Sequence, residues 1–428
     1  QYVVVDFLWY RRKYMPEAST NSVGADTIDE WGRVVPDPSR WPSAADGNGF
    51  TKVAESVHQM GLKFGIHVMK GLSLQAYNAN TIILDSTKGV AYEEGGRVWT
   101  AKDIGVEDNV CKWMNQGFMA VNTSLGAGRA FLRSLYAQYA QWGVDFVKND
   151  CVFGDDFDMG EISYVSELLG EFERPIIYSL SPGANANLEL AKKINGLVNM
   201  YRVTADDWDQ WEHVKAHFDV SSRDFAAANM IGATGLNGRS WPDLDMLPLG
   251  WLSNADSNEG PHRQCNLTID EQKTQMTLWS MAKSPIMFGG DMRRLDSMTY
   301  GLITNPVLLE INSFSSNNHE LPSISGSSTS GGPHQVATSQ QSGGTDIRAW
   351  IATGRSGETY LAFFNLSPEK MVISAKRTDV LPSLAVRKEL KAACRGREIW
   401  TGQDLGEVGG SISKEVEPHG TALFLIKC

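Results

Sequence analysis

Charged side chains in this chain follow several apolar, strand-like segments. Asp150 follows the segment VDFVKN, and Asp206 follows NMYRVTA. Comparable positions after other such segments carry Asp6, His67, Lys148, Ser181, Arg202, Asp243 and Asp245. An aspartate after a strand often caps the next helix or turn, so each one alone has an ordinary structural explanation. Five acids at consecutive strand ends instead predict one pocket of carboxylates with two cations among them.

Two carboxylates suffice to hydrolyse a glycosidic bond, one as nucleophile or base and the other as proton donor to the leaving oxygen. Lys148 lies two residues before Asp150 on the same face of the expected strand. Its positive charge would lower the pKa of Asp150, which suits a nucleophile.

Asp206 has the opposite surroundings, because Asp207 is its neighbour and Trp208 is close. Negative charge and an apolar ring both raise the pKa of a carboxyl group, which suits the proton donor. Asp207 and Asp209 are alternatives for this role. Their other expected role is to cap the helix that starts near Trp208.

Strand-like and helix-like segments alternate from the start of the chain to about residue 312. The seven expected strands are Tyr2–Asp6, Lys63–Val68, Val144–Lys148, Pro175–Ser179, Val198–Val203, Asp243–Leu247 and Pro285–Phe288. The expected helices between them include Gly49–Met60, Gly128–Trp142, Gly160–Phe172 and Ile269–Lys283. This alternation predicts a parallel (β/α)8 TIM barrel, which places catalytic groups at the C-terminal ends of its strands. Since such a barrel needs eight strands, we interpret its first strand as missing from the chain.

A change in composition divides the rest of the chain. Residues 316–345 include a tract rich in serine and glycine (SISGSSTSGGPHQVATSQQSGG), which predicts a flexible linker. Residues 346–428 contain short alternating segments separated by turn signals, which predict an antiparallel β-sandwich. The expected strands are Arg348–Thr353, Thr359–Asn365, Met371–Ser374, Ile412–Val416 and Thr421–Lys427. We therefore expect a catalytic barrel at 1–315 followed by the linker and the sandwich.

Composition excludes several classes of function. The 428 residues carry a net charge of −11, which argues against a nucleic-acid partner. No apolar run approaches the roughly 20 residues of a membrane span. The five cysteines lack the spacing of metal ligands, so a metal site is not expected. Three N-x-S/T sequons, at Asn122, Asn266 and Asn365, suit a secreted glycoprotein, although Thr268 in the second also fits a helix capping box with Glu271.

Several motifs in this order resemble those of glycoside hydrolase family 27, the α-galactosidases and their relatives. The nucleophile motif K-x-D with a following cysteine is matched by Lys148-Asn149-Asp150-Cys151, and R-x-x-x-D is matched from Arg202 to Asp206. The other matching segments are GRVVPDPSRWP (32–42), WPDLDML (241–247), TQMTLW (274–279) with the following Ser284-Pro285, and the closing PHGTALFLIK. The resemblance covers nearly the whole chain.

The resemblance implies roles for individual residues. Asp150 would be the nucleophile and Asp206 the general acid/base, while Lys148 and Arg202 would bind sugar hydroxyls. The implied remaining contacts are Asp6 at the far end of the ring, with Trp241 and Asp243 in the segment that closes the pocket. The family uses no metal or organic cofactor, and it has a disulfide beside the nucleophile that Cys111 and Cys151 would form. By their position in the sandwich, Cys394 and Cys428 are candidates for a second disulfide, which would leave Cys265 free.

Three departures from the family pattern concern substrate specificity. Phe7 replaces a second aspartate after Asp6, His67 replaces a tyrosine, and Ser181 replaces a glutamate. With these residues the chain resembles a plant-type branch active on α-D-galactosides and β-L-arabinopyranosides. The expected protein is a secreted, retaining exo-glycosidase of the cell wall or vacuole, acting on oligosaccharides, polysaccharides or glycoconjugates that end in galactose or arabinopyranose. The alternatives are an α-N-acetylgalactosaminidase, for which Ser181 could make room, and a non-catalytic sugar-binding protein on the same fold.

Overall fold

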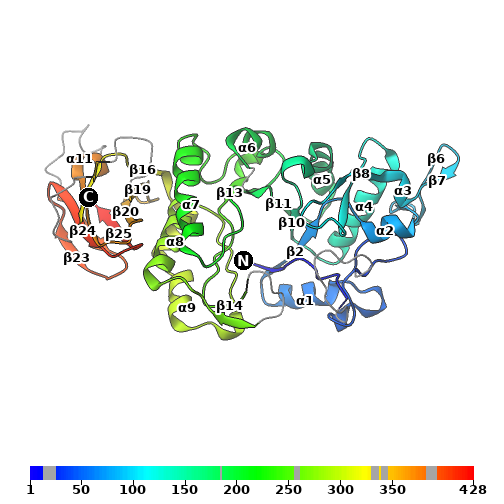
Figure 1. The fold of residues 1–428 in the computed structure, drawn as a ribbon, viewed down its shortest axis with the longest axis horizontal. Coiled ribbons are helices and arrows are strands. Elements are labelled where there is room, and N and C mark those ends of the chain that lie inside the picture. The colour runs from blue at the N-terminus through cyan, green and yellow to red at the C-terminus, as the bar shows by residue number, and fades with distance from the viewer. Residues whose placement is uncertain (13–25, 184–185, 255–260, 329–336, 339–345, 382–392) are drawn as a thin grey trace. The chain divides into compact units, whose positions relative to one another are not determined.

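The computed structural model describes residues 1–12, 26–183, 186–254, 261–328, 337–338, 346–381 and 393–428. The chain forms two compact units (Figure 1). The first comprises Gln1–Arg202 and Gly235–Ser240, and the second comprises Val203–Thr234 and Trp241–Cys428. The region expected as one barrel, residues 1–315, therefore contributes to both units.

A parallel sheet is the centre of the first unit. Five of the six strands of this sheet belong to the unit, in the order β1 (Tyr2–Val5), β2 (Lys63–Met69), β10 (Phe146–Asp150), β11 (Ile177–Leu180) and β12 (Met200–Arg202). Five of the seven expected strands are thus present in parallel pairing. In the register between β2 and β10, Lys148 lies opposite His67 and Asp150 lies opposite Met69. All five strands point the same way, so their C-terminal ends lie at one edge of the sheet.

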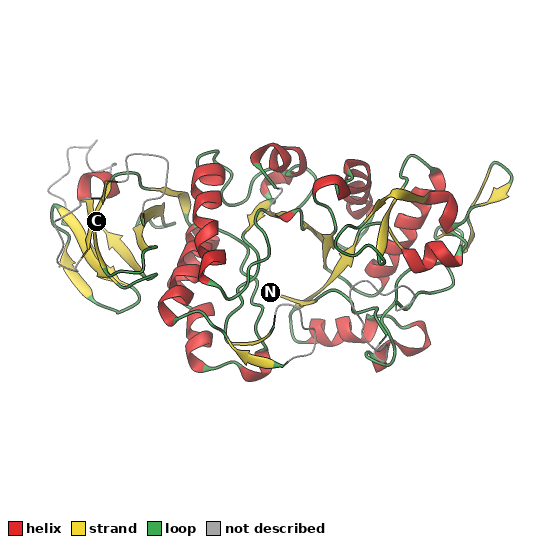
Figure 2. Ribbon diagram, viewed as in Figure 1, coloured by secondary structure: helices red, strands yellow, loops and turns green. Residues whose placement is uncertain are grey.

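Helices separate these strands along the chain, as the alternating pattern predicts. They are α1 (Thr51–Gln59), α4 (Gly126–Gln141), α5 (Met159–Glu171) and α6 (Leu188–Ile194). Figure 2 shows helices, in red, on more than one side of the strands, in yellow. The side chains of Phe64, Ile66, Val147 and Leu180 are fully or almost fully buried, because a parallel sheet covered by helices has little contact with water.

An insertion between β2 and α4 was not expected from the sequence. It contains an antiparallel sheet of β3 (Leu72–Ser73), β9 (Phe118–Val121) and β8 (Gly105–Val110), with α2 (Leu74–Ala79) and α3 (Ala101–Ile104). Two short hairpins complete it, β4 (Leu84–Asp85) with β5 (Val90–Ala91) and β6 (Glu93–Glu94) with β7 (Arg97–Val98). These strands are too short for an alternating pattern to mark them.

The second unit begins with the helical part that follows β12. It includes β13 (Trp241–Asp243), α7 (Trp211–Asp219), a π-helix at Val220–Ala226, α8 (Ile269–Met281), α9 (Ser297–Ile303) and α10 (Pro306–Phe314). Helix α8 begins with the expected capping box, in which the Thr268 hydroxyl accepts from the Glu271 N–H and the Glu271 carboxylate from the Thr268 N–H. Leu247 and Phe288 form a parallel bridge, which brings the last two expected strands of the barrel region together.

The C-terminal sandwich contains two antiparallel sheets. One has the order β16 (Ser316–Glu320), β19 (Ile347–Thr353), β20 (Thr359–Asn365), β25 (Thr421–Lys427), β22 (Arg395–Glu398) and β23 (Asp404–Glu407). The other has the order β18 (Ala337–Thr338), β17 (Ile324–Ser328), β21 (Met371–Lys376) and β24 (Ser411–Val416). Their shared core includes Ile347, Leu361, Phe363, Ile373 and Phe424, so the predicted sandwich and its five expected strands are confirmed.

The expected linker is wrong at its N-terminal end. Residues 316–320 and 324–328 form β16 and β17, which pair with β19 and β21. Backbone hydrogen bonds hold this polar segment in the sheets, and Ile324 is buried in the core, although its serines and glycine predict a flexible chain. Residues 329–336 and 339–345, the rest of the expected linker, lie outside the described residues.

The structure contains the two expected disulfide bonds. Cys111 is bonded to Cys151, and Cys394 is bonded to Cys428 with 4.0 Å between their Cα atoms. Cys265 is a free thiol. The side chain of Asn365 is buried and its amide donates to three carbonyl groups, so this sequon is not accessible to glycosylation in the folded protein. Among the helices that the structure describes, none has the length and apolar character to cross a membrane.

Candidate active site

The carboxylate of Asp150 lies at the C-terminal end of β10, in the middle of the parallel sheet. His67, on the neighbouring strand β2, places its Nε2 3.2 Å from Oδ2 of Asp150. The backbone N–H of Cys151 donates to the other oxygen, Oδ1. Cys151 has a φ of 60°, which is unusual for a residue with a side chain and occurs where the surrounding structure holds the turn.

Opposing effects set the ionisation of Asp150. Burial favours the neutral acid and raises the pKa, but the hydrogen bond and charge of His67, the Cys151 N–H and the charge of Arg202 lower it further. The net result is a pKa below the usual value for an aspartate. A carboxylate with a lowered pKa that is still partly exposed is suited to attack an electrophilic carbon.

Aromatic rings surround the His67–Asp150 pair. The ring of Phe7 meets the His67 ring edge to face, with 5.7 Å between their centroids, and meets Trp113 at the same distance. Phe7 and Trp113 are both partly exposed, so these rings are not part of the closed core. The first unit thus brings Phe7, His67 and Asp150 together, as expected from the strand ends.

Trp113 was not identified from the sequence. It follows Cys111 by two residues, and Cys111 is bonded to the cysteine next to Asp150. The disulfide therefore brings the segment around Trp113 to the site. The predicted Cys111–Cys151 bond was a signal that could have located it.

The other predicted residues of this unit differ in their surroundings. Lys148 and Arg202 are partly exposed, on β10 and β12. Ser181 is fully buried just after β11, and its hydroxyl has no hydrogen-bond partner among the described residues. Asp6 is exposed at the end of β1, where its carboxylate accepts from the Phe7 N–H at 2.8 Å. A buried hydroxyl without a partner can accept or donate a hydrogen bond when a polar ligand arrives.

A buried charged network supports the turn after Asp150. The Lys70 N–H donates to the Asp150 carbonyl at 3.1 Å, and the Lys70 ammonium lies 3.3 Å from the Asp156 carboxylate. Glu161 on α5 accepts from the Gly71 N–H at 2.6 Å, and burial raises its pKa to about 7.

Asp156 also lies beside the disulfide. Its carboxylate and the two cysteine sulfurs form a group of three possible metal ligands within 4.8 Å of one another. Both sulfurs are bonded to each other, so neither is a thiolate that could ligate a metal. Asp156 serves the ion pair with Lys70 instead.

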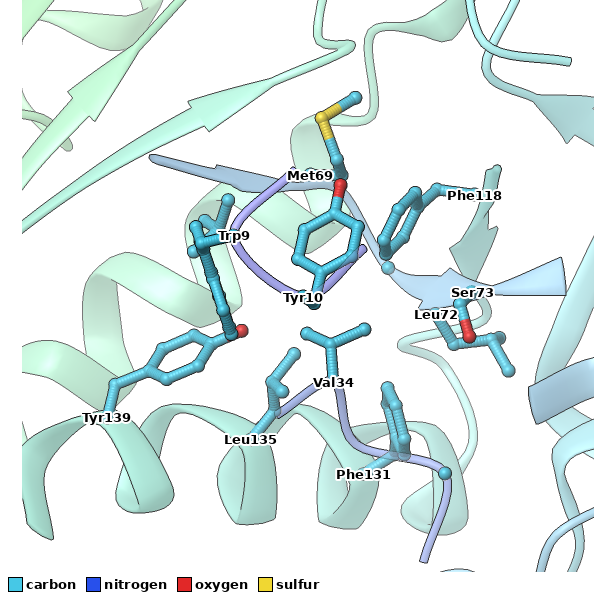
Figure 3. A pocket seen from close by; sticks show the side chains of 13 residues that line it. Trp9, Tyr10, Val34, Met69, Leu72, Ser73, Phe118, Phe131, Leu135 and Tyr139 are labelled. Atoms are coloured by element: carbon cyan, nitrogen blue, oxygen red, sulfur yellow. The ribbon is translucent and has the colours of Figure 1, made fainter. Parts of the chain in front are cut away.

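A small apolar pocket lies next to this network but cannot hold a sugar. Figure 3 shows Tyr10 in it between Trp9 and Phe118, whose ring centroids are 5.0 and 5.4 Å from that of Tyr10. Its free volume is about 10 Å³, which is the space of about one water molecule. The pocket therefore belongs to the packing under the site.

In the second unit, three aspartates that were alternatives for the proton donor have different surroundings. Asp206 is exposed, whereas Asp207 is fully buried and Asp209 almost fully buried. Asp209 binds the guanidinium of Arg263 and accepts from the Asn266 N–H at 2.7 Å, and despite its burial these contacts lower its pKa. An acid held ionised by an arginine is a poor proton donor, so Asp209 does not suit the role.

Asp207 has the opposite electrostatic surroundings. Its burial and the charge of Asp245 raise its pKa well above the usual value, with a smaller contribution from Asp209. Its N–H donates to the Asp245 carboxylate at 2.9 Å, and its own carboxyl group accepts from Gln275 at 2.5 Å. The surroundings of Asp207 therefore favour its neutral form inside the fold, and Asp206 is the aspartate of this loop that is exposed to solvent.

The expected capping role of Asp207 and Asp209 is wrong. Helix α7 begins at Trp211 and its N-cap residue is Gln210, which makes no capping hydrogen bond with its side chain. Both aspartates instead use their carboxyl groups for contacts with distant segments. Sequence alone could not show these contacts because the partners are 54 to 68 residues away along the chain.

The remaining predicted residues lie on β13. Trp241 is partly exposed, whereas Asp243 is fully buried and its carboxylate accepts from the Asp245 N–H at 2.9 Å. Asp245, with a φ of 74°, is held in a strained conformation and links Asp243 to Asp207. The sequence identifies Asp245 as a strand-end acid, but only the structure shows that it contacts both Asp243 and Asp207.

Comparisons with known proteins identify the family of this fold. Residues 123–314 match the family model described as alpha galactosidase A, and residues 344–426 match that of the alpha galactosidase C-terminal beta sandwich domain. An alpha-galactosidase of Saccharomyces mikatae is 26% identical over 67% of this chain, and the match spans 60% of that enzyme's length. An alpha-galactosidase of Cyamopsis tetragonoloba is 21% identical over 93% of this chain and 73% of its own length.

A solved structure gives a more extensive match. The β-L-arabinopyranosidase of glycoside hydrolase family 27 from Geobacillus stearothermophilus superposes with a TM-score of 0.81 and 32% identity. The match covers 100% of this chain and 88% of that chain. The predicted fold class, a TIM barrel with a C-terminal β-sandwich, is thereby confirmed, and the chain belongs to glycoside hydrolase family 27.

Proposed function

We propose that this protein is a retaining exo-glycosidase that removes terminal β-L-arabinopyranosyl and α-D-galactosyl residues. The observation that carries the proposal is the carboxylate of Asp150, which is partly exposed at a strand end between His67 and the N–H of Cys151 and has a lowered pKa. Membership of family 27 supports the same reaction class, as does the alpha-galactosidase activity named for the relatives in yeast and in Cyamopsis.

The proposed reaction has two steps. Asp150 attacks the anomeric carbon and forms a covalent glycosyl ester while Asp206 donates a proton to the leaving oxygen. Asp206 then takes a proton from water, which attacks the anomeric carbon and releases the sugar and Asp150. Because configuration inverts twice, the anomer first released has the configuration of the substrate. An NMR spectrum of the first-formed sugar that showed the inverted anomer would overturn the mechanism.

The exposure of Asp206 supports its assignment as general acid/base. Asp206→Ala should abolish hydrolysis of glycosides with poor leaving groups by about 10²–10⁴-fold and spare dinitrophenyl glycosides, whose phenolate needs little protonation. Azide should restore turnover of the activated substrate in this variant. Glu212→Ala is the control, since Glu212 is another exposed acid, on α7. Equal inactivity of Asp206→Ala on the dinitrophenyl glycoside, without azide rescue, would transfer the role to another acid.

Phe7 supports the preference for arabinopyranosides. β-L-Arabinopyranose has the hydroxyl pattern of α-D-galactose but lacks the hydroxymethyl group at C5. Phe7 offers no hydrogen bond to such a group, and its partly exposed ring contacts the His67 that binds Asp150. A hydroxymethyl group without a partner loses about 0.5–1.5 kcal/mol of binding, whereas a bare C5 beside an apolar ring loses nothing.

The test of this preference is kcat/KM for nitrophenyl β-L-arabinopyranoside and nitrophenyl α-D-galactoside. The arabinopyranoside should be hydrolysed at a comparable rate or faster, and Phe7→Asp should shift the ratio toward the galactoside. Phe7→Leu controls for the loss of the ring alone. A wild-type preference for the galactoside above about a hundredfold, or about 2.7 kcal/mol, would contradict the role of Phe7.

The remaining contacts follow from this assignment. Lys148, Arg202, Asp6 and Ser181 would bind sugar hydroxyls, with Trp241 and Asp243 in the segment that closes the pocket. The substrates would be oligosaccharides, polysaccharides or glycoconjugates that end in these sugars. The two disulfides favour an oxidising compartment, so we propose that the enzyme works outside the cytosol.

A further inference from the structure

A hairpin of the second unit lies at the C-terminal ends of two neighbouring strand segments. Its strands, β14 (Trp251–Ser253) and β15 (His262–Gln264), follow Leu247, and the segment 291–294 follows Phe288. Leu247 and Phe288 are bridged in parallel, and the Asp291 N–H donates to the Trp251 carbonyl at 2.8 Å. Loops after parallel strands of a barrel form the face on which substrates bind.

One face of this hairpin is fixed to the loop that carries Asp206. Arg263 of β15 holds the Asp209 carboxylate through two N–H groups, one of them with Nη2 3.0 Å from Oδ1. Asn266, just after β15, donates its N–H to the same carboxylate at 2.7 Å. Asp209 lies three residues after Asp206, so the hairpin and the acid/base loop are joined by charged hydrogen bonds.

The other face carries an aromatic surface. In the antiparallel register Trp251 lies opposite Gln264, and His262 lies opposite Ser253, so Trp251 and His262 point to the same side and Arg263 to the other. The planes of the two rings are within 5° of parallel, with 6.4 Å between their centroids. Trp251 is only partly exposed, whereas His262 is exposed.

Charged side chains complete a hollow around Trp251. The guanidinium of Arg294 lies 4.9 Å from the Trp251 ring, and Arg293 binds the Asp291 carboxylate at 2.6 Å. With His262 these residues line an open hollow of about 550 Å³, within the range of about 300–1,000 Å³ common for small-molecule sites. The hydrogen bonds from Arg293 hold the pKa of Asp291 at about 2, so its carboxylate is an acceptor at neutral pH.

We propose that the hollow lined by Trp251, His262, Asp291, Arg293 and Arg294 binds a neutral pyranose unit of the substrate beyond the sugar that is removed. This inference rests on the proposed function. The apolar C–H face of a pyranose packs on an indole ring, while vicinal hydroxyls need donors and acceptors side by side. Asp291 and Arg293 present such a pair, and their charges cancel. The site would favour polymeric substrates over small glycosides.

Two measurements test this site. One measures binding without hydrolysis, and the other measures hydrolysis itself. The first is migration of the intact protein through native gels that contain a galactomannan, whose α-galactosyl residues branch from a long mannose chain. The second is kcat/KM on the same galactomannan and on a nitrophenyl glycoside. Trp251→Ala should lose retardation and raise KM on the polymer about tenfold, with kcat and all nitrophenyl kinetics within about twofold of wild type.

Two further variants exclude trivial explanations. Trp99→Ala removes another tryptophan with an arginine over its ring, Arg97 at 4.0 Å, from a hairpin of the first unit, and it should leave retardation unchanged. Trp251→Phe keeps an aromatic face. If Trp251→Ala loses retardation because the ring is missing, and not because the protein is misfolded, Trp251→Phe should retain part of the retardation. The sugar site would be overturned if Trp251→Ala were retarded by the galactomannan as strongly as the wild type. It would also be overturned if the wild type were not retarded at all. Absence of nitrophenyl glycoside hydrolysis in the wild type would instead overturn the proposed function.

Discussion

Asp150 is partly exposed and Asp207 is fully buried, and their surroundings drive their ionisation in opposite directions. Asp150 faces His67, a backbone N–H and the charge of Arg202, which bring its pKa below the usual value despite burial. Asp207 faces Asp245 and the neutral amide of Gln275, so burial and the neighbouring acid raise its pKa. Burial alone therefore does not tell a nucleophile from a structural acid, because the charges and donors around the carboxyl group set its state.

Replacing each of these aspartates by asparagine should separate their roles most clearly. Asp150→Asn should lower kcat by about 10⁴-fold or more on every substrate, because the proposed nucleophile is lost. Asp207→Asn should retain most activity, because an amide resembles the protonated acid and can still accept from Gln275. Steady-state kinetics on a nitrophenyl glycoside measure both. An Asp207→Asn variant as inactive as Asp150→Asn would show that the buried acid takes part in the chemistry.

Glu161 is a second buried acid, and it extends the comparison to stability. It accepts backbone N–H groups from Gly71 and Val121, but burial dominates and raises its pKa from 4.5 to about 7. An acid with a raised pKa in the folded state stabilises the fold below its unfolded pKa and loses that contribution as the pH rises. The shift corresponds to an unfolding free energy on the order of 3 kcal/mol, lost between about pH 4.5 and pH 7.

Glu161→Gln should remove this pH dependence. Urea unfolding at pH 4.5, 6 and 8 should show that the free energy of unfolding falls less with pH in the variant than in the wild type. Glu167→Gln is the matched control, because Glu167 is exposed on the same helix. Parallel curves for the Glu161→Gln variant and the wild type would contradict the assignment of a raised pKa to Glu161.

The contribution of His67 to Asp150 should have the smallest effect of the three. His67→Phe removes the hydrogen bond that helps to keep Asp150 ionised, so the pKa of Asp150 rises. The acid limb of the kcat/KM profile should move to higher pH, with a loss of about tenfold to a hundredfold near the optimum. His58→Phe is the control, since His58 pairs with Asp145 at 2.7 Å, just before the opposite end of β10. An unchanged acid limb in His67→Phe would leave the Cys151 N–H and Arg202 to account for the low pKa of Asp150.

The strands and helices that follow a simple apolar pattern could be predicted from the sequence. Short apolar segments separated by helical ones predicted the parallel strands β1, β2, β10, β11 and β12, because a strand buried on both faces is apolar throughout. Alternating apolar residues predicted the five longer strands of the sandwich, because burial on one face gives a period of two. Strand-end acids and the motifs shared with family 27 predicted Asp150 and Asp206 as the two acids, and the resemblance implied the bond between Cys111 and Cys151. Such features depend on residues that are close in the chain or on short motifs.

The groups that surround each acid depend on the tertiary fold and could not be predicted from the sequence. His67 reaches Asp150 because β2 and β10 pair, although 83 residues separate them, and Trp113 reaches Phe7 because a disulfide brings in its segment. Residues 316–328 resembled a linker because strand pairing, rather than side-chain pattern, holds them. A pKa depends on distance through space, and local sequence does not encode the distance between residues far apart in the chain.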